Sequence, residues 1–358
     1  MAIQPAGCMR QRALILAFVG TAVCCGAAEI AVRSHHWWLR AHGVAMGSLR
    51  LDDHLGWRAT EKYHLEAAAR DSAGNTYVLR VDTDQRGFRT LGPTPPRGMR
   101  ILVIGDSFTQ AVEVSNDKTY AAILQDSLPA RVFAYGSGGY GTLQEYLILD
   151  EVLDEVRPEI VIWQFSTNDF INNDEELERN SLVNNNGRRR PYWLPESGVY
   201  FDVPSRFAYL QHLAGSYSRA GYALLQRADL LLAGRRETVE AVIARQGASH
   251  AGFQRSVRTT LTLMQKVRRR ALATRVIAFS VDDGQPFYAA LARISRESGI
   301  EFVDGIPQAI RAAEMAGQRV RAADQSHWAE EGHRICASQL VVHLRMPGSP
   351  GPAVKAEK

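Results

Sequence analysis

The feature of the sequence that most constrains its fold is a series of short apolar runs separated by helical patterns. Five runs predict strands, at residues 101–104, 132–134, 160–165, 275–281 and 301–303. Most of them do not alternate apolar and polar residues, which indicates strands covered on both faces. Helical patterns lie between them, at residues 120–128, 143–156 and 286–298, and give the β-α-β order of a parallel sheet. We therefore predict an α/β fold with three layers, α/β/α, in which functional groups follow the carboxyl ends of the strands.

The amino terminus has the composition of a membrane anchor or an export signal. Arg10 and Arg12 precede an apolar run, residues 13–32, that only Glu29 interrupts. The uncharged part of the run is slightly shorter than the ~20 residues that cross a bilayer, and tilting or local thinning accommodates the difference. Two tryptophans follow it, as is typical of a membrane interface. We expect an uncleaved transmembrane anchor with the rest of the chain on the extracytoplasmic side; small residues directly before Glu29 keep a cleaved signal and secretion as the alternative.

Composition and charge exclude several classes of protein. Hydrophobic residues make up 46% and charged residues 22% of the chain, which argues against a disordered or fibrous protein. The net charge of +4 is too small for the basic surface that nucleic acid binding needs. Cys336 is the only cysteine beyond residue 25, so the main body has no disulfide framework. The cysteines and histidines form no metal-binding pattern, and we expect no metal and no cofactor.

These patterns divide the chain into segments with different roles. The segments are a signal anchor and interface at 1–40, a small extension and linker at 41–98, the α/β domain at 99–346 with a helical and loop insertion at 171–273, and a flexible tail at 347–358. The linker assignment rests on the Gly- and Pro-rich end of the extension, and the tail assignment on Pro, Gly and Lys.

A serine follows the first predicted strand at the edge where functional groups are expected. Gly105, Asp106 and Ser107 come directly after this strand, and a hydroxyl there can act as a nucleophile if a base accepts its proton. Glycine, aspartate and serine also form ordinary turns, so the signal alone is weak.

A histidine with its own acid supplies the missing base. Only His327 and His333 follow the fifth strand closely, and only His327 has an aspartate, Asp324, three residues before it. At this spacing the carboxylate can hold one imidazole nitrogen while the other faces the serine. We therefore expect Ser107, His327 and Asp324 to form one site, with His333 as the competing base.

Two further segments supply hydrogen-bond donors for a negatively charged oxygen. Residues 134–142, rich in glycine, follow the second strand and allow close approach of backbone N–H groups to a substrate. Asn168 follows the third strand, and its side-chain amide can point into the same crevice. An Asn-Asp pair is also a common helix cap.

Taken together, the Gly105–Ser107 segment, the glycine segment, Asn168 and Asp324-x-x-His327 resemble the blocks of the SGNH (GDSL-type) hydrolase superfamily. The resemblance covers most of residues 99–345. It implies a flavodoxin-like α/β/α sheet, a nucleophile at Ser107, a base at His327 and an orienting acid at Asp324. It also implies an oxyanion hole made of the N–H groups of Ser107 and Gly139 and the side chain of Asn168.

Two short segments of the extension, residues 55–58 and 86–89, resemble the amino-terminal extension of membrane-anchored bacterial members of this superfamily. They are less specific than the catalytic blocks.

The sequence departs from the superfamily pattern at two positions. Ser166 replaces the usual glycine of the third block, and Ala134 replaces an asparagine often found in the second. These departures leave the register of the second block open, so that Gly138 or Gly141 can take the place of Gly139.

The glycine segment also fits a dinucleotide-binding fingerprint, G-x-G-x-x-G, at residues 136–141. The acid that would bind the ribose, Asp169, lies further on than the usual ~20 residues. A dehydrogenase interpretation also leaves Ser107, Asp324 and His327 unexplained, so we favour the hydrolase.

We therefore expect a serine-dependent carboxylic ester hydrolase, of acyl or acetyl esterase type, that works through a Ser-His-Asp triad and an acyl-enzyme. Its expected partners are a small acyl ester or an acylated polysaccharide and the membrane, with no nucleic acid. The alternatives are an O-acyltransferase acting on a cell-envelope polysaccharide, and a catalytically silent binding module.

Overall fold

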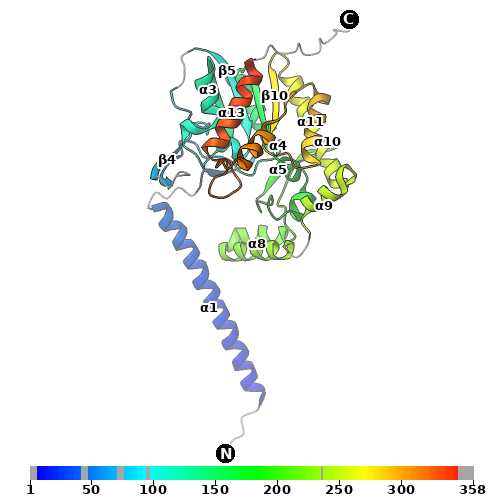
Figure 1. Ribbon diagram of the computed structural model, residues 1–358. Helices are drawn as coiled ribbons and strands as arrows, with labels where there is room; N and C mark the ends of the chain where they lie inside the picture. The colour runs from blue at the N-terminus through cyan, green and yellow to red at the C-terminus, as the bar shows by residue number, and fades with distance from the viewer. Residues whose placement is uncertain (1–5, 42–46, 71–75, 94–96, 235–236, 346–358) are drawn as a thin grey trace, which may run out of the picture. The chain divides into compact units, whose positions relative to one another are not determined.

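The computed structural model describes residues 6–41, 47–70, 76–93, 97–234 and 237–345 (Figure 1). The chain forms two compact units. The anchor unit consists of residues 1–46 and 205–235, and the sheet unit of residues 47–204 and 236–358. The tail predicted at 347–358 lies outside the described residues, as do residues 94–96 of the predicted linker.

A five-stranded sheet forms the centre of the sheet unit and confirms the predicted α/β fold. Its order is β11-β10-β7-β5-β6, and every neighbouring pair is parallel. The strands are β5 (Met99–Gly105), β6 (Ala130–Gly136), β7 (Ile160–Phe165), β10 (Arg275–Ser280) and β11 (Glu301–Val303). In chain order this is a 2-1-3-4-5 sheet, whose strand order reverses between β5 and β7. Ligands of such sheets bind outside the carboxyl ends of the two strands at this reversal.

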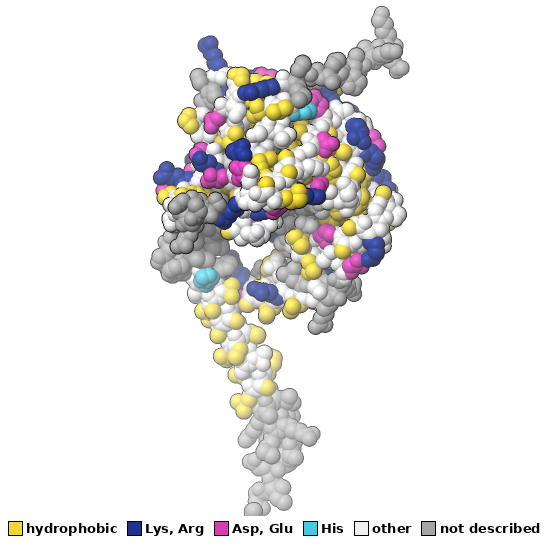
Figure 2. Space-filling view, viewed as in Figure 1, with side chains coloured by type: hydrophobic (Ala, Val, Ile, Leu, Met, Phe, Trp, Pro, Cys, Tyr) yellow, Lys and Arg dark blue, Asp and Glu magenta, His cyan; other side chains and the backbone are white. Residues whose placement is uncertain are grey.

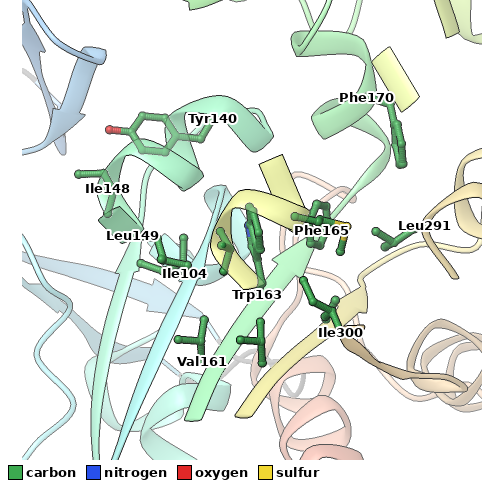
Figure 3. Packing of buried hydrophobic residues seen from close by; sticks show 14 of the residues in the cluster. Ile104, Tyr140, Ile148, Leu149, Val161, Trp163, Phe165, Phe170, Leu291 and Ile300 are labelled. Atoms are coloured by element: carbon green, nitrogen blue, oxygen red, sulfur yellow. The ribbon is translucent and has the colours of Figure 1, made fainter. Parts of the chain in front are cut away.

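Helices cover both faces of the sheet, which explains why its strands are apolar throughout (Figure 1). Buried side chains of α4 (Thr142–Val156), α10 (Ala251–Arg270) and α11 (Phe287–Ser298) pack on one face. Those of α3 (Tyr120–Ser127), α12 (Ile306–Met315) and α13 (Glu330–Arg345) pack on the other. Figure 3 shows the first core, which contains Val161, Trp163 and Phe165 of the central strand β7 together with Leu149 of α4 and Leu291 of α11.

The predicted extension folds as two antiparallel hairpins in the sheet unit. These are β1 (Leu49–Asp52) with β2 (Gly56–Ala59), and β3 (His64–Arg70) with β4 (Thr76–Asp82). The indole N–H of Trp57 donates to the Gly138 carbonyl at 3.0 Å, and the Arg89 N–H donates to the Ala134 carbonyl at 2.8 Å. Both extension segments that resemble membrane-anchored members therefore support the glycine segment after β6.

The insertion contributes to both units. In the sheet unit it forms the end of α5 (Thr167–Asn172), α6 (Glu175–Asn180), β8 (Arg190–Leu194), β9 (Gly198–Asp202), α9 (Val239–Gln246) and α10, and in the anchor unit α7 (Ala208–Tyr217) and α8 (Arg219–Ala233). The remaining short helices are α2 (Ser107–Gln110), η1 (Asn116–Lys118) and η2 (Gly247–Ser249).

The anchor unit begins with the long helix α1 (Ala6–Ala41), which confirms the predicted apolar amino-terminal helix. Its segment Ile15–His35 is long and apolar enough to cross a membrane. Figure 2 shows hydrophobic side chains along the described part of this helix.

Candidate active site

Ser107 lies where β5 ends and α2 begins, at the reversal of the strand order. A Cβ atom on Gly105 would lie 2.2 Å from the Gln164 side chain, so only glycine allows the chain to leave the strand here. The Asp106 carboxylate then accepts a hydrogen bond from the Phe108 N–H at 2.9 Å and caps the helix. This strand–turn–helix connection places the Ser107 hydroxyl beyond the carboxyl edge of the sheet.

The structure brings His327 and Asp324 to this serine. The Nε2 atom of His327 lies 2.8 Å from Ser107 Oγ, and its Nδ1 atom hydrogen-bonds to the Asp324 carboxylate. The other Asp324 oxygen accepts from the N–H groups of Ser326 and His327 at 3.0 and 3.1 Å. Phe108 packs against the imidazole, with ring centroids 5.1 Å apart. The arrangement is that of a nucleophile, a base and an orienting acid.

A second carboxylate, Glu113, also faces the base and was not among the residues predicted from the sequence. Its Oε1 atom lies 3.4 Å from His327 Nδ1, and its side chain is 19% exposed, against 41% for Asp324. Burial raises the pKa of Glu113. The only sequence signal for it is an acid flanked by two valines shortly after Ser107.

These two carboxylates determine the protonation of His327. Burial by itself lowers the pKa of the imidazole, but the charge of Glu113, the hydrogen bond that His327 donates to Asp324 and the charge of Asp324 together outweigh burial. The pKa of His327 is therefore raised above its ordinary 6.5. Burial raises the pKa of Asp324, but the hydrogen bonds that it accepts from the His327 ring and from the N–H groups of Ser326 and His327 together outweigh burial and lower this pKa.

His333, the competing base, has a structural environment. It is fully buried, its Nδ1 atom accepts from the Tyr120 N–H at 3.2 Å, and its ring stacks on that of Tyr120. Burial lowers its pKa to about 3, so it stays neutral. These contacts of His333 with Tyr120 hold α13 against α3.

Among Gly138, Gly139 and Gly141, only Gly139 has a backbone N–H with no partner among the described residues. The N–H of Gly138 donates to the Gln110 side chain at 2.9 Å, and that of Gly141 to Gln144 at 3.4 Å. No hydrogen bond joins the Gly139 N–H to any residue that the structure describes. Gly139 has a φ of +76°, and a Cβ atom there would lie 2.6 Å from the Asn186 side chain. This geometry favours Gly139 over Gly138 and Gly141 as an oxyanion donor.

Asn168 lies in the first turn of α5, after β7, on the other side of the strand reversal from Ser107. Its side-chain nitrogen donates to the Tyr140 carbonyl at 2.8 Å, which ties it to the glycine segment. The second hydrogen of the same amide group remains for a substrate oxygen.

Ser166, the departure from the third block, has a defined contact. Its hydroxyl donates to Asp106 at 2.8 Å, while its N–H donates to Asp169 at 2.8 Å. A glycine could not make the first bond, so the serine holds the carboxylate that precedes the nucleophile. Asp169 is fully buried and also accepts from the Thr142 hydroxyl at 3.4 Å, so its carboxylate is not exposed to a ribose hydroxyl.

Glu145 and Asp169 form a buried pair of carboxyl groups below the site. Glu145 accepts from the Trp163 indole N–H at 2.7 Å and interacts electrostatically with Asp169. Burial, together with the charge of nearby carboxylates, raises the pKa of both groups well above its ordinary value, so the pair holds a proton to a higher pH than an isolated carboxyl group does.

The Glu145–Asp169 pair predicts stability that falls as the pH rises. The folded state binds more protons than the unfolded state above the ordinary Glu pKa of 4.5, so stability is full below that value and is lost toward the raised pKa. One proton gives a slope of at most about 1.4 kcal/mol per pH unit. We expect Glu145→Gln to reduce this slope, because glutamine still accepts from Trp163 without needing a proton. Urea unfolding in detergent across the neutral to alkaline range measures it; an unchanged slope would show that the pair does not titrate.

Glu113, Asp324 and His327 form the only group of three or more potential metal ligands among the described residues. One ligand atom of each lies within 4.8 Å of those of the other two. Both carboxylates point at the imidazole Nδ1, which carries a proton when Nε2 accepts from Ser107. We therefore interpret Glu113 and Asp324 as a pair of carboxylates that hold the proton on His327 Nδ1. A cavity of about 620 Å³ borders its carboxylate side and exposes Asp324 to solvent.

Comparisons with known proteins find one matching family and several similar solved structures. Residues 103–335, more than half of the chain, match the GDSL-like Lipase/Acylhydrolase family. Similar solved structures include TesA (15% identity, TM-score 0.39, covering 69% of this chain and 98% of that one) and the acetylxylan esterase Axe2 from Geobacillus stearothermophilus (13%, 0.38, 70% and 95%). A psychrotrophic esterase, EstA from Pseudoalteromonas sp., gives 11% identity, a TM-score of 0.39 and coverage of 68% and 96%. No curated relative matches the chain.

Proposed function

The chain belongs to the GDSL-like lipase/acylhydrolase family and is an ester-bond hydrolase, and we propose that it cleaves carboxylic esters with Ser107 as nucleophile. The observation that carries the proposal is the continuous hydrogen-bonded path from Ser107 Oγ through both imidazole nitrogens of His327 to Asp324. A serine hydroxyl is a poor nucleophile until such a base removes its proton.

The proposed reaction proceeds in two halves. In the first, His327 Nε2 takes the Ser107 proton as Oγ attacks the ester carbonyl, and the imidazolium then protonates the leaving alcohol. In the second, His327 takes a proton from water as the water oxygen attacks the acyl-enzyme carbonyl. The imidazolium then returns this proton to Ser107 Oγ as the Oγ–acyl bond breaks, which releases the carboxylic acid and restores the free enzyme. Asp324 holds the imidazole in the tautomer with the proton on Nδ1 and stabilises its charged form.

The negative oxygen of each tetrahedral intermediate requires donors that are already in place. We assign this role to the N–H groups of Ser107 and Gly139 and to the Asn168 side chain. These donors come from the ends of β5, β6 and β7, so the rigid sheet sets their spacing. Removal of one such donor typically costs about 10²–10³ in kcat.

We place the enzyme at a membrane through α1, with the sheet unit on the extracytoplasmic side. The support is the apolar segment Ile15–His35 and the arginines that precede it.

Covalent labelling of the full chain tests the nucleophile directly. Diethyl p-nitrophenyl phosphate transfers its phosphoryl group to an activated serine and releases p-nitrophenol. Trypsin yields the peptide of residues 101–118, which contains both Ser107 and Ser115. We expect fragmentation of this peptide by mass spectrometry to place the adduct on Ser107. Ser115→Ala should leave labelling unchanged and His327→Ala should slow it strongly; an adduct on another residue would contradict the assignment.

A further inference from the structure

Glu29, the single acid in the apolar part of α1, binds the junction between helices α7 and α8. Glu29 accepts hydrogen bonds from the Ser218 hydroxyl at 2.9 Å and from the N–H groups of Arg219 and Ala220 at 3.2 and 3.1 Å. Arg33, one turn further on, bonds to Glu29 and donates to the Tyr217 carbonyl at 3.4 Å. Glu29 thereby caps the first N–H groups of α8, at its junction with α7.

The α7–α8 hairpin, residues 208–233, carries apolar side chains on its exposed surface. On α7 these are Tyr209, Leu210, Leu213 and Tyr217, and on α8 Leu224, Leu231 and Leu232. At 100° per residue, each set falls within an arc of about 100°, so each helix presents one apolar stripe. The exposed Arg227 borders the stripe of α8. Outside the stripe of α8, the buried Asp229 forms an ion pair with Arg206, which precedes α7, at 3.3 Å.

The contact with Glu29 sets the depth of the hairpin along α1. Glu29 lies six residues before His35, the end of the segment that can cross a membrane. At 1.5 Å per residue this is about 9 Å along the helix axis. Amphipathic helices at a membrane surface bury their apolar face about 5–10 Å into the boundary between headgroups and acyl chains.

We propose that the α7–α8 hairpin is a second membrane-binding element, which lies in the bilayer interface with its apolar stripes among the acyl chains. The exposed stripes contact the lipid that surrounds α1, because Glu29 and Arg33 hold the hairpin at the depth of that lipid. Arg227 reaches toward anionic headgroups beside the stripe. The hairpin and α1 together orient the enzyme through two contacts with the membrane.

The proposal is tested with a fluorescent probe on the full chain in vesicles. Cys8, Cys24 and Cys25 are replaced by alanine, Cys336 is buried, and single cysteines are introduced by Leu224→Cys or Met315→Cys and labelled with NBD. The two positions are matched in exposure, at 70% and 78%, but Met315 belongs to α12 of the sheet unit. The vesicles contain phosphatidylcholine and phosphatidylglycerol, with a nitroxide on some acyl chains near the headgroup.

We expect the probe at position 224 to emit at shorter wavelength and to be quenched by the nitroxide, and the probe at 315 to emit as in water without quenching. Glu29→Ala should reduce quenching at position 224 while hydrolysis of a water-soluble aryl ester, which reports folding of the sheet unit, is retained. A probe at 224 that behaves like the probe at 315 would overturn the proposal. Quenching at 224 that is undiminished in Glu29→Ala would overturn the role of Glu29 in setting the depth.

Discussion

Replacement of Ser107 by alanine is expected to lower kcat/KM for p-nitrophenyl acetate by at least about 10⁴-fold. The change removes the only atom that the structure places 2.8 Å from His327 Nε2, so no acyl-enzyme can form. The residual rate then comes from substrate binding and the oxyanion donors acting on water. Initial rates of p-nitrophenol release at matched protein concentration measure the effect.

The same variant should fold normally, because the Ser107 side chain is not part of the core. Its circular dichroism and its unfolding midpoint in urea are expected to match those of the wild type. Ser115→Ala is the matched control: Ser115 lies in the same segment and accepts from the Arg80 N–H at 3.2 Å, far from any role in proton transfer. Wild-type turnover by Ser107→Ala would refute the nucleophile, and an equal loss in Ser115→Ala would indicate a structural effect instead.

The sequence was sufficient to predict the sheet and the side chains at its edge. Uninterrupted apolar runs are typical of strands with helices on both faces, and β5, β6, β7, β10 and β11 form the predicted parallel sheet. Once the strands are known, the chemistry that follows their carboxyl ends must meet at one edge. Ser107 and Asn168 follow β5 and β7 in this way. The Asp324-x-x-His327 pair is local in sequence, so its spacing alone indicated that the two side chains can meet.

Residues that act through contacts distant in sequence were not predictable in the same way. Glu113 reaches His327 across more than two hundred residues, and the two valines that flank it do not indicate a contact with a histidine so distant in sequence. Ser166 looked like a departure from a family pattern, and only the structure shows its bond to Asp106. Glu29 looked like an interruption of an apolar helix, although it caps another helix nearly two hundred residues later.

Glu113 predicts an unusual response to loss of the orienting acid. With a single acid, Asp→Asn stabilises the wrong imidazole tautomer and costs about 10⁴ in kcat. Here Glu113 Oε1 lies 3.4 Å from the same Nδ1 atom and can accept its proton after a small movement. We therefore expect Asp324→Asn to lose only about 10²–10³ in kcat/KM and Glu113→Gln about 3- to 10-fold, while the double variant loses about 10⁴ or more. A double variant no worse than Asp324→Asn would show that Glu113 does not support the base.

The pH dependence of Glu113→Gln separates a positioning role from a structural one. His327 must be neutral to accept the Ser107 proton, so kcat/KM rises with pH through the pKa of His327 in the free enzyme. Burial lowers that pKa, and the charges of Glu113 and Asp324 together raise it above 6.5. Removal of the Glu113 charge leaves burial less opposed, and the acidic limb should move to lower pH, whereas Ser115→Ala should not move it. A purely structural Glu113 would lower the rate equally at every pH, and a limb that stayed in place or moved to higher pH would contradict the electrostatic role of this carboxylate.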